Sequence, residues 1–202
     1  MSYFEAENVA HRLTFYVLIA CWWIFGLTFW LRKRPPKVQE TKRDLTSLVG
    51  LALQIAAYVL IWMFPLHRRR FISQAYQSHV QDWLFAAATM ILAVASVWMV
   101  NSAARRLGKQ WALTARVVEG HNLIQDGPYG LVRNPIYTGM LGILIATGMA
   151  SGQWIALLAS IVIFMIGTYI RVRSEEKILR EAFGPEFEAY ERKVPALIPG
   201  IY

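Results

Sequence analysis

Three stretches of the chain, residues 13–31, 45–66 and 83–100, contain no charged residue and are almost entirely apolar. Each is close to the roughly 20 residues that an α-helix needs to cross the hydrocarbon core of a bilayer. Charged and polar residues are concentrated in the segments between them. The pattern predicts three transmembrane helices in the first half of the chain.

A fourth apolar stretch, residues 136–170, also lacks any charge but is much longer. As one helix it would measure roughly 52 Å, which is too long for one span and slightly short for two full ones. Its best turn signal is Ser151-Gly152-Gln153. We therefore expect a hairpin of two shortish helices, followed by a cytoplasmic helix that starts at Arg171 and stops at Gly184-Pro185.

These elements predict an all-α, polytopic integral membrane protein with about five transmembrane helices. The whole chain, 1–202, then forms one membrane domain, in which residues 1–100 hold three spans and residues 101–202 form the half that carries the chemistry. No glycine-rich dinucleotide motif follows a strand pattern, so a Rossmann domain is not expected.

Basic residues are distributed unequally between the two predicted sides of the membrane. Segments 32–44, 102–134 and 171–202 carry 17 of the 21 Lys and Arg residues, and the other four are Arg12 and residues 68–70. By the positive-inside rule, the amino terminus lies outside, and the larger basic segments and the carboxyl terminus are cytoplasmic. The net charge of +8 then favours contact with anionic membrane lipids. Nucleic acid is not an expected partner, because the basic residues are split among loops.

Candidate chemistry is confined to the second half of the chain. The single cysteine, Cys21, lies inside the first predicted span, and the four histidines are too scattered to suggest a metal site. The loop 119–137 and the charged segment after residue 170 remain. Both ends of a membrane hairpin reach the same surface, so these two segments are expected to form one pocket.

The loop combines fixed geometry with aromatic faces. Two prolines and two glycines between residues 127 and 135 restrict the backbone and allow close approach. Tyr129 and Tyr137 offer π faces suited to an adenine ring or a sulfonium cation. This composition favours a rigid binding turn where the chain enters the membrane.

Charged residues at the other end of the hairpin, Arg171 and Glu175, are the candidate catalytic residues. Arg171 can hold an anionic group in a bidentate fork, and Glu175 can accept hydrogen bonds from hydroxyl or amino groups. The same spacing is also typical of an ordinary salt bridge at the solvated end of a helix. Arg133 can bind an anionic part of a substrate or reach towards lipid head groups.

Several spaced motifs are similar to those of one known family. They are His121-x-Leu123-Ile124, Gly127-x-Tyr129, Arg133-Asn134-Pro135-x-Tyr137-x-Gly139, Arg171-x-x-x-Glu175-Glu176 and Phe183-Gly184-x-x-Phe187-x-x-Tyr190. Together they resemble the isoprenylcysteine carboxyl methyltransferases, which form a wider group with phospholipid methyltransferases and, more remotely, sterol reductases. The resemblance covers about residues 105–199.

The resemblance implies an integral membrane enzyme that uses S-adenosylmethionine and holds it under the carboxyl-terminal helices at the cytoplasmic face. Arg171 would sit beside the acceptor and orient its carboxylate. Thr114 matches a further cofactor position in less similar surroundings. Asn134 stands where the family usually has His, and it keeps hydrogen-bonding capacity but cannot titrate. The implied cofactor contacts are His121, Asn122, Leu123, Ile124, Tyr129, Asn134, Pro135, Ile136, Tyr137 and Glu175.

The expected function is therefore methyl transfer to a lipophilic small-molecule or lipidated acceptor at the membrane interface. Carboxyl O-methylation of a prenylcysteine-like or other lipid substrate is favoured, because an ionised carboxylate needs no general base. The alternatives are N-methylation of a phospholipid amine, NADPH-dependent reduction of a polycyclic lipid, and a non-catalytic membrane protein.

Overall fold

Six α-helices make up most of the chain that the computed structural model describes, which comprises residues 3–31, 42–43, 46–68, 79–108, 116–117 and 123–200. A short 3-10 helix, η2 (Gly127–Gly130), precedes α4, and a two-residue strand β1 (Lys42–Arg43) pairs antiparallel with β2 (Arg116–Val117). The helices are α1 (Tyr3–Trp30), α2 (Thr46–Arg68), α3 (His79–Leu107), α4 (Pro135–Ser151), α5 (Trp154–Phe183) and α6 (Pro185–Lys193).

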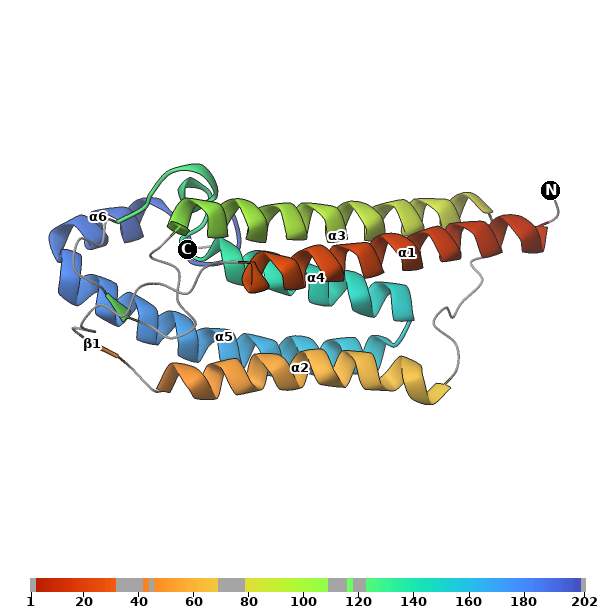
Figure 1. Ribbon diagram of the computed structural model, residues 1–202, viewed down its shortest axis with the longest axis horizontal. Helices are drawn as coiled ribbons and strands as arrows, with labels where there is room; N and C mark the ends of the chain where they lie inside the picture. The colour runs from red at the N-terminus through yellow and green to blue at the C-terminus, as the bar shows by residue number, and fades with distance from the viewer. Residues whose placement is uncertain are drawn as a thin grey trace.

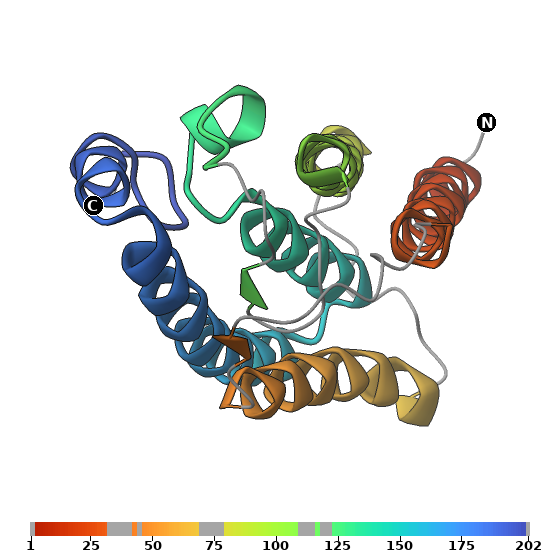
Figure 2. The same cartoon turned by 60° about the vertical axis from the view of Figure 1, so that its left-hand side comes forward.

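The five longer helices lie along one axis in two layers with α4 between them (Figure 1). Helix α1 packs on α3, α2 packs on α5, and α4 contacts both pairs. Successive helices run in opposite directions, so α1 begins at one end of the bundle, and the start of α4, the end of α5 and helix α6 lie at the other (Figure 1). Figure 2 shows η2 at this same end, beside the start of α4.

Among the described residues, four helices are long and apolar enough to cross a membrane. The qualifying stretches are Val9–Trp30, Thr46–Met63, Val80–Leu107 and Trp154–Phe183, and α4 is a shorter apolar helix of 17 residues. Large apolar side chains on these helices point outward, as do Trp23 and Ile155, which are 70% and 85% exposed. Such faces are stable against lipid, and the prediction of an all-α integral membrane protein is confirmed.

The predicted hairpin is present, but its arms are unequal. Gly152 ends α4 in the left-handed conformation, with φ 63°, and its N–H donates to the carbonyl of Gly148, which confirms the turn. The expectation of two shortish helices and a separate helix starting at Arg171 was wrong, because α5 runs without a break from Trp154 to Phe183. Gly184 ends α5 directly before Pro185, as predicted.

Small residues let the long helices approach closely. A Cβ added to Gly50 of α2 would lie 2.5 Å from the carbonyl oxygen of Gly167 in α5, and one added to Gly139 of α4 would lie 2.6 Å from the carbonyl oxygen of Ser96 in α3. Close backbone approach of this kind is the usual basis of helix packing inside membranes. Here it draws α2 against the part of α5 that carries Arg171.

Candidate active site

A rigid turn leads the chain into α4. We call residues 127–134 the proximal turn: it begins with η2, whose Pro128 and Tyr129 are buried, and ends where Pro135 starts the helix. Gly127 has φ 60°, a conformation that side chains other than glycine rarely adopt. Pro135 occupies the first turn of α4, where its missing N–H costs no hydrogen bond.

Three predicted residues from two helices meet directly after this turn. Nε of Arg171 donates a hydrogen bond to the hydroxyl of Tyr137 at 2.7 Å, and that hydroxyl donates in turn to Glu175. The guanidinium also lies over the Tyr137 ring, 5.4 Å from its centroid, and Nη2 is 3.5 Å from Glu175 Oε1. The hairpin thus brings its two ends together, as the sequence predicts.

The surroundings of Arg171 are mostly protein. The residue is only 5% exposed, and Nη1 lies 3.5 Å from the backbone carbonyl oxygen of Ser47 in α2. The alternative of a solvated helix end is therefore wrong for Arg171, although it describes Arg173, which is exposed and donates to Tyr169. A buried guanidinium in a membrane helix is costly unless it is paired or used.

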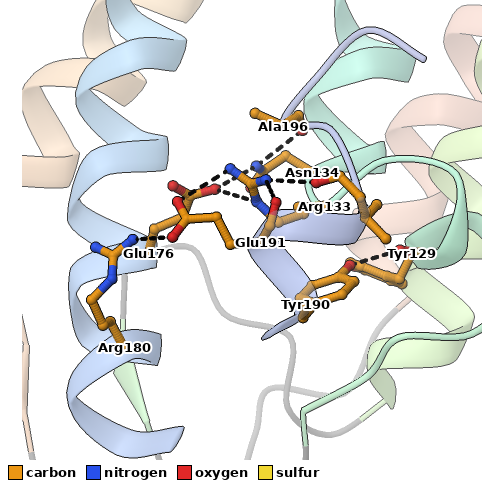
Figure 3. Close-up of polar contacts among 9 residues, drawn as sticks. Tyr129, Arg133, Asn134, Glu176, Arg180, Tyr190, Glu191 and Ala196 are labelled. Carbon is orange, nitrogen blue, oxygen red and sulfur yellow. Dashed lines mark hydrogen bonds and ion pairs between the residues drawn. The ribbon is translucent and has the colours of Figure 1, made fainter. Parts of the chain in front are cut away.

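A second ionic cluster joins the proximal turn to α5 and α6 (Figure 3). Nε of Arg133 is 2.9 Å from Glu176 Oε1, and the two side chains are 10% and 11% exposed. Nη1 of Arg133 donates to the carbonyls of Glu191, at 3.1 Å, and Val194, at 2.6 Å. Arg133 thus has several protein acceptors, while its predicted role in binding substrate stays a prediction.

The chain after α6 lies against the proximal turn. The backbone N–H groups of Arg133 and Asn134 donate to the carbonyls of Pro195 and Ala196, at 2.8 and 3.0 Å. Nδ2 of Asn134 reaches the Ala196 carbonyl at 3.1 Å and Glu176 Oε1 at 3.5 Å (Figure 3). The side-chain amide of Asn134 is therefore used as a hydrogen-bond donor.

Helix α6 is fixed to the start of the turn by a buried tyrosine. The Tyr190 hydroxyl donates to the carbonyl of Tyr129 at 2.7 Å (Figure 3). Burial raises the pKa of Tyr190 above its ordinary value of about 10, so this hydroxyl stays protonated at neutral pH. Tyr129 is itself buried, which places its ring inside the fold.

The remaining predicted cofactor residues are placed as follows. Leu123 and Ile124 are half-buried just before η2, and Ile136 is half-buried in the first turn of α4. His121, Asn122 and Thr114 lie outside the described residues. Within the described ranges, no group of three or more His, Cys, Asp or Glu side chains could hold a metal ion.

Sequence reasoning missed two contributions to this region. Ser47 and Gly50 of α2 contact Arg171, although nothing in an apolar span distinguishes such small residues. Residues 194–197 hold the proximal turn through backbone carbonyls, which leave no mark in the sequence. Glu176 and Tyr190 did carry a signal, since both belong to the motifs quoted above.

Comparison with known proteins gives a match over the second half of the chain. A family model described as phospholipid methyltransferase matches residues 84–186, which include most of α3, the proximal turn, α4 and α5. The chain belongs to the phospholipid methyltransferase family. The match contains Tyr137, Arg171 and Glu175, so the cluster falls within the part that defines this family.

Relatives of this phospholipid methyltransferase family member carry several names. The chain is 29% identical over 165 residues to a protein-S-isoprenylcysteine O-methyltransferase of Schizosaccharomyces pombe, which covers 77% of this chain and 66% of the relative. It is 30% identical over 103 residues to the cobalt-zinc-cadmium resistance protein CzcN of Cupriavidus metallidurans, covering 50% and 47%. It is 36% identical over 74 residues to a methanethiol S-methyltransferase of Pseudomonas deceptionensis, covering 36% and 27%. The chain therefore spans between about a quarter and two thirds of these relatives.

Proposed function

We propose that the protein transfers a methyl group from S-adenosylmethionine to a lipophilic acceptor at the membrane surface, with a carboxylate as the favoured acceptor group. The observation that carries the proposal is Arg171, a buried cation in a membrane helix whose orientation is fixed by a residue of the neighbouring helix. Family membership and the names of the relatives support the same class of reaction.

The residues of the site fit such a methyl donor. When bound, S-adenosylmethionine supplies an electrophilic methyl group on a sulfonium, together with ribose hydroxyls and an ammonium group. Glu175 is an acceptor suited to those hydroxyl or ammonium donors, since its side chain is 27% exposed amid buried neighbours. In the described structure, its contacts with Tyr137 and Arg171 both involve Oε1, so Oε2 is available for this role.

Arg171 is suited to orienting the acceptor. Its Nε is committed to Tyr137 and its Nη2 faces Glu175, so the plane of the guanidinium is fixed. A fixed cation can hold an acceptor carboxylate in line with the methyl group without reorganising during the reaction. The residues therefore supply alignment and charge, and an ionised carboxylate requires no proton removal.

The location of the site suits a reaction between two phases. The cluster lies where α4 begins and α5 leaves its apolar stretch, at the end of the bundle that carries η2 and α6. A water-soluble donor and an acceptor with a long apolar tail can each reach such a position from its own phase. This favours a lipid or lipidated acceptor over a small polar one.

The experiment measures transfer of labelled methyl from S-adenosylmethionine by the purified protein in nanodiscs. Prenylcysteine analogues and phospholipid amines are offered separately, and the product is then treated with alkali. A methyl ester releases labelled methanol, whereas an N-methyl product is stable. We expect the label to be released by alkali, as a methyl ester requires. Label that stays on the phospholipid after alkali would show that the acceptor is an amine and not a carboxylate.

Arg171→Gln is the test variant and Arg173→Gln is its matched control. The two arginines lie on the same helix, but Arg173 is exposed. Loss of a charged hydrogen-bonding partner worth about 1.5–3 kcal/mol predicts a fall in kcat/KM of roughly 10- to 150-fold for Arg171→Gln. Arg173→Gln should retain the wild-type rate. A folded wild-type protein that binds no S-adenosylmethionine would overturn the proposal.

A further inference from the structure

We propose that Arg133 and Glu176 are positioning residues, which hold the carboxyl-terminal strap (residues 194–197) on the proximal turn and so fix the cofactor-facing start of α4. The inference rests on the proposed function for its link to the cofactor. Its structural part, the attachment of the strap, is independent of that function. The proposal assigns to Arg133 a structural role, the attachment of the carboxyl-terminal strap to the proximal turn.

The guanidinium of Arg133 is placed to act as the centre of this attachment. Nε is paired with Glu176 on α5, whereas Nη1 donates to the carbonyl of Val194 at the start of the strap. Nη2 lies 3.6 Å from Glu191 Oε1 on α6. One side chain therefore links the hairpin, the last helix and the strap (Figure 3).

Glu176 is the member of the cluster that fixes the direction of this guanidinium. Its carboxylate is buried and receives Arg133 Nε at 2.9 Å and Asn134 Nδ2 at 3.5 Å. A buried carboxylate with two donors from neighbouring residues orients both of them. Without its charge, Arg133 keeps only its contacts with α6 and with the strap.

The strap adds backbone hydrogen bonds that depend on this geometry. Arg133 N–H donates to Pro195 O and Asn134 N–H to Ala196 O, and Thr138 Oγ1 donates to the Leu197 carbonyl at 2.7 Å. These contacts bracket residues 134–137, whose side chains include predicted cofactor contacts. Release of the strap is therefore expected to loosen the cofactor site while the Arg171–Tyr137 contact stays in place.

Hydrogen exchange of the amides of Arg133 and Asn134 tests the attachment directly, in nanodiscs and without a turnover assay. In Glu176→Gln we expect these amides to exchange about tenfold faster or more, since a charge-assisted bond is replaced by a weaker neutral one. The KM for S-adenosylmethionine should rise by about tenfold with kcat within about twofold, because binding is weakened and the acceptor contact is not.

The control variant is Arg180→Gln, which breaks another ion pair between α5 and α6. Arg180 lies 2.5 Å from Glu191 Oε2 and so shares Glu191 with Arg133, but the Arg180 and Glu191 side chains are 42% and 33% exposed, whereas those of Arg133 and Glu176 are 10% and 11% exposed. Neither exchange nor KM should change in Arg180→Gln.

Arg133→Lys is the second test variant in case Glu176→Gln folds poorly. Lysine keeps the charge but cannot reproduce the fork, so both readouts should move in the same direction.

A charge-swapped protein, Arg133→Glu with Glu176→Arg, separates the fork from simple charge pairing. It restores opposite charges but places no donor next to the Val194 carbonyl, so exchange should remain fast. Full rescue would overturn the role of the carbonyl contacts.

Wild-type exchange rates in Glu176→Gln and Arg133→Lys would overturn the attachment. Fast exchange with an unchanged KM would overturn the positioning role. A wild-type protein without methyl transfer would overturn the proposed function alone, since exchange still reports on the strap.

Discussion

Replacing Gly50 with alanine tests whether the close approach of α2 and α5 keeps Arg171 in place. A Cβ at Gly50 would lie 2.5 Å from the carbonyl oxygen of Gly167 and 2.6 Å from Cγ of Arg171, whereas ordinary van der Waals contact begins at 3.4 Å. The helices must therefore separate by roughly 1 Å, and overpacking of this kind costs about 1–3 kcal/mol. A displacement of that size at Arg171 can lower methyl transfer by up to about 100-fold.

Gly26 of α1 provides the matched control, because a Cβ there would have no heavy atom within 4 Å. Thermal unfolding in detergent and the rate of labelled methyl transfer are measured for Gly50→Ala and Gly26→Ala. At about 2–4 °C per kcal/mol for a chain of this size, Gly50→Ala should lower Tm by about 2–12 °C, and Gly26→Ala should leave both readouts unchanged. Wild-type stability and rate in Gly50→Ala would refute the reasoning.

Two further predictions concern buried hydrogen bonds. Tyr190→Phe leaves the Tyr129 carbonyl without its buried donor and should cost about 1–3 kcal/mol in thermal unfolding. Burial raises the pKa of Tyr190 in the folded protein, so its contribution to stability is present below a pH of about 10 and is lost as the pH rises above that value. Tyr190→Phe should reduce this loss of stability at alkaline pH, and the measurement is Tm as a function of pH. Thr168→Val removes the 2.9 Å hydrogen bond from Gln54 Nε2 between α2 and α5 and leaves a buried amide without this acceptor. It should therefore lower Tm more than the double variant Gln54→Leu with Thr168→Val, in which the amide is also removed. An equal decrease of Tm in both variants would contradict this prediction.

Local patterns in the sequence were sufficient to predict the spans and the turns. Uncharged stretches marked the long helices, Gly152 marked the hairpin turn and Gly184 marked the end of α5. A membrane span depends on the apolar solvent around it and is marked by apolar composition, and a turn depends on neighbouring residues and is marked by local residues such as glycine. The meeting of Tyr137 with Arg171 was also predictable once the hairpin was assumed.

The continuation of α5 through its charged segment was not predictable in this way. Arg171 looks like the start of a cytoplasmic helix because burying a charge is unfavourable without partners. Its partners come from α2 and α4, and Glu176 receives its partner from the proximal turn. Such compensation depends on tertiary contacts between distant segments, so the spacing of these residues in the sequence could not exclude the solvated alternative.

The unequal arms of the hairpin set the depth of the candidate site. At about 1.5 Å per residue, α4 with 17 residues is roughly 25 Å long, and α5 with 30 residues is roughly 45 Å long. Both arms meet at Gly152, and the hydrocarbon core of a bilayer is about 30 Å thick. We therefore expect the start of α4 to lie deeper than the end of α5, near the boundary between acyl chains and head groups. Under the proposed function, an acceptor anchored by an apolar tail would reach this depth without leaving its leaflet.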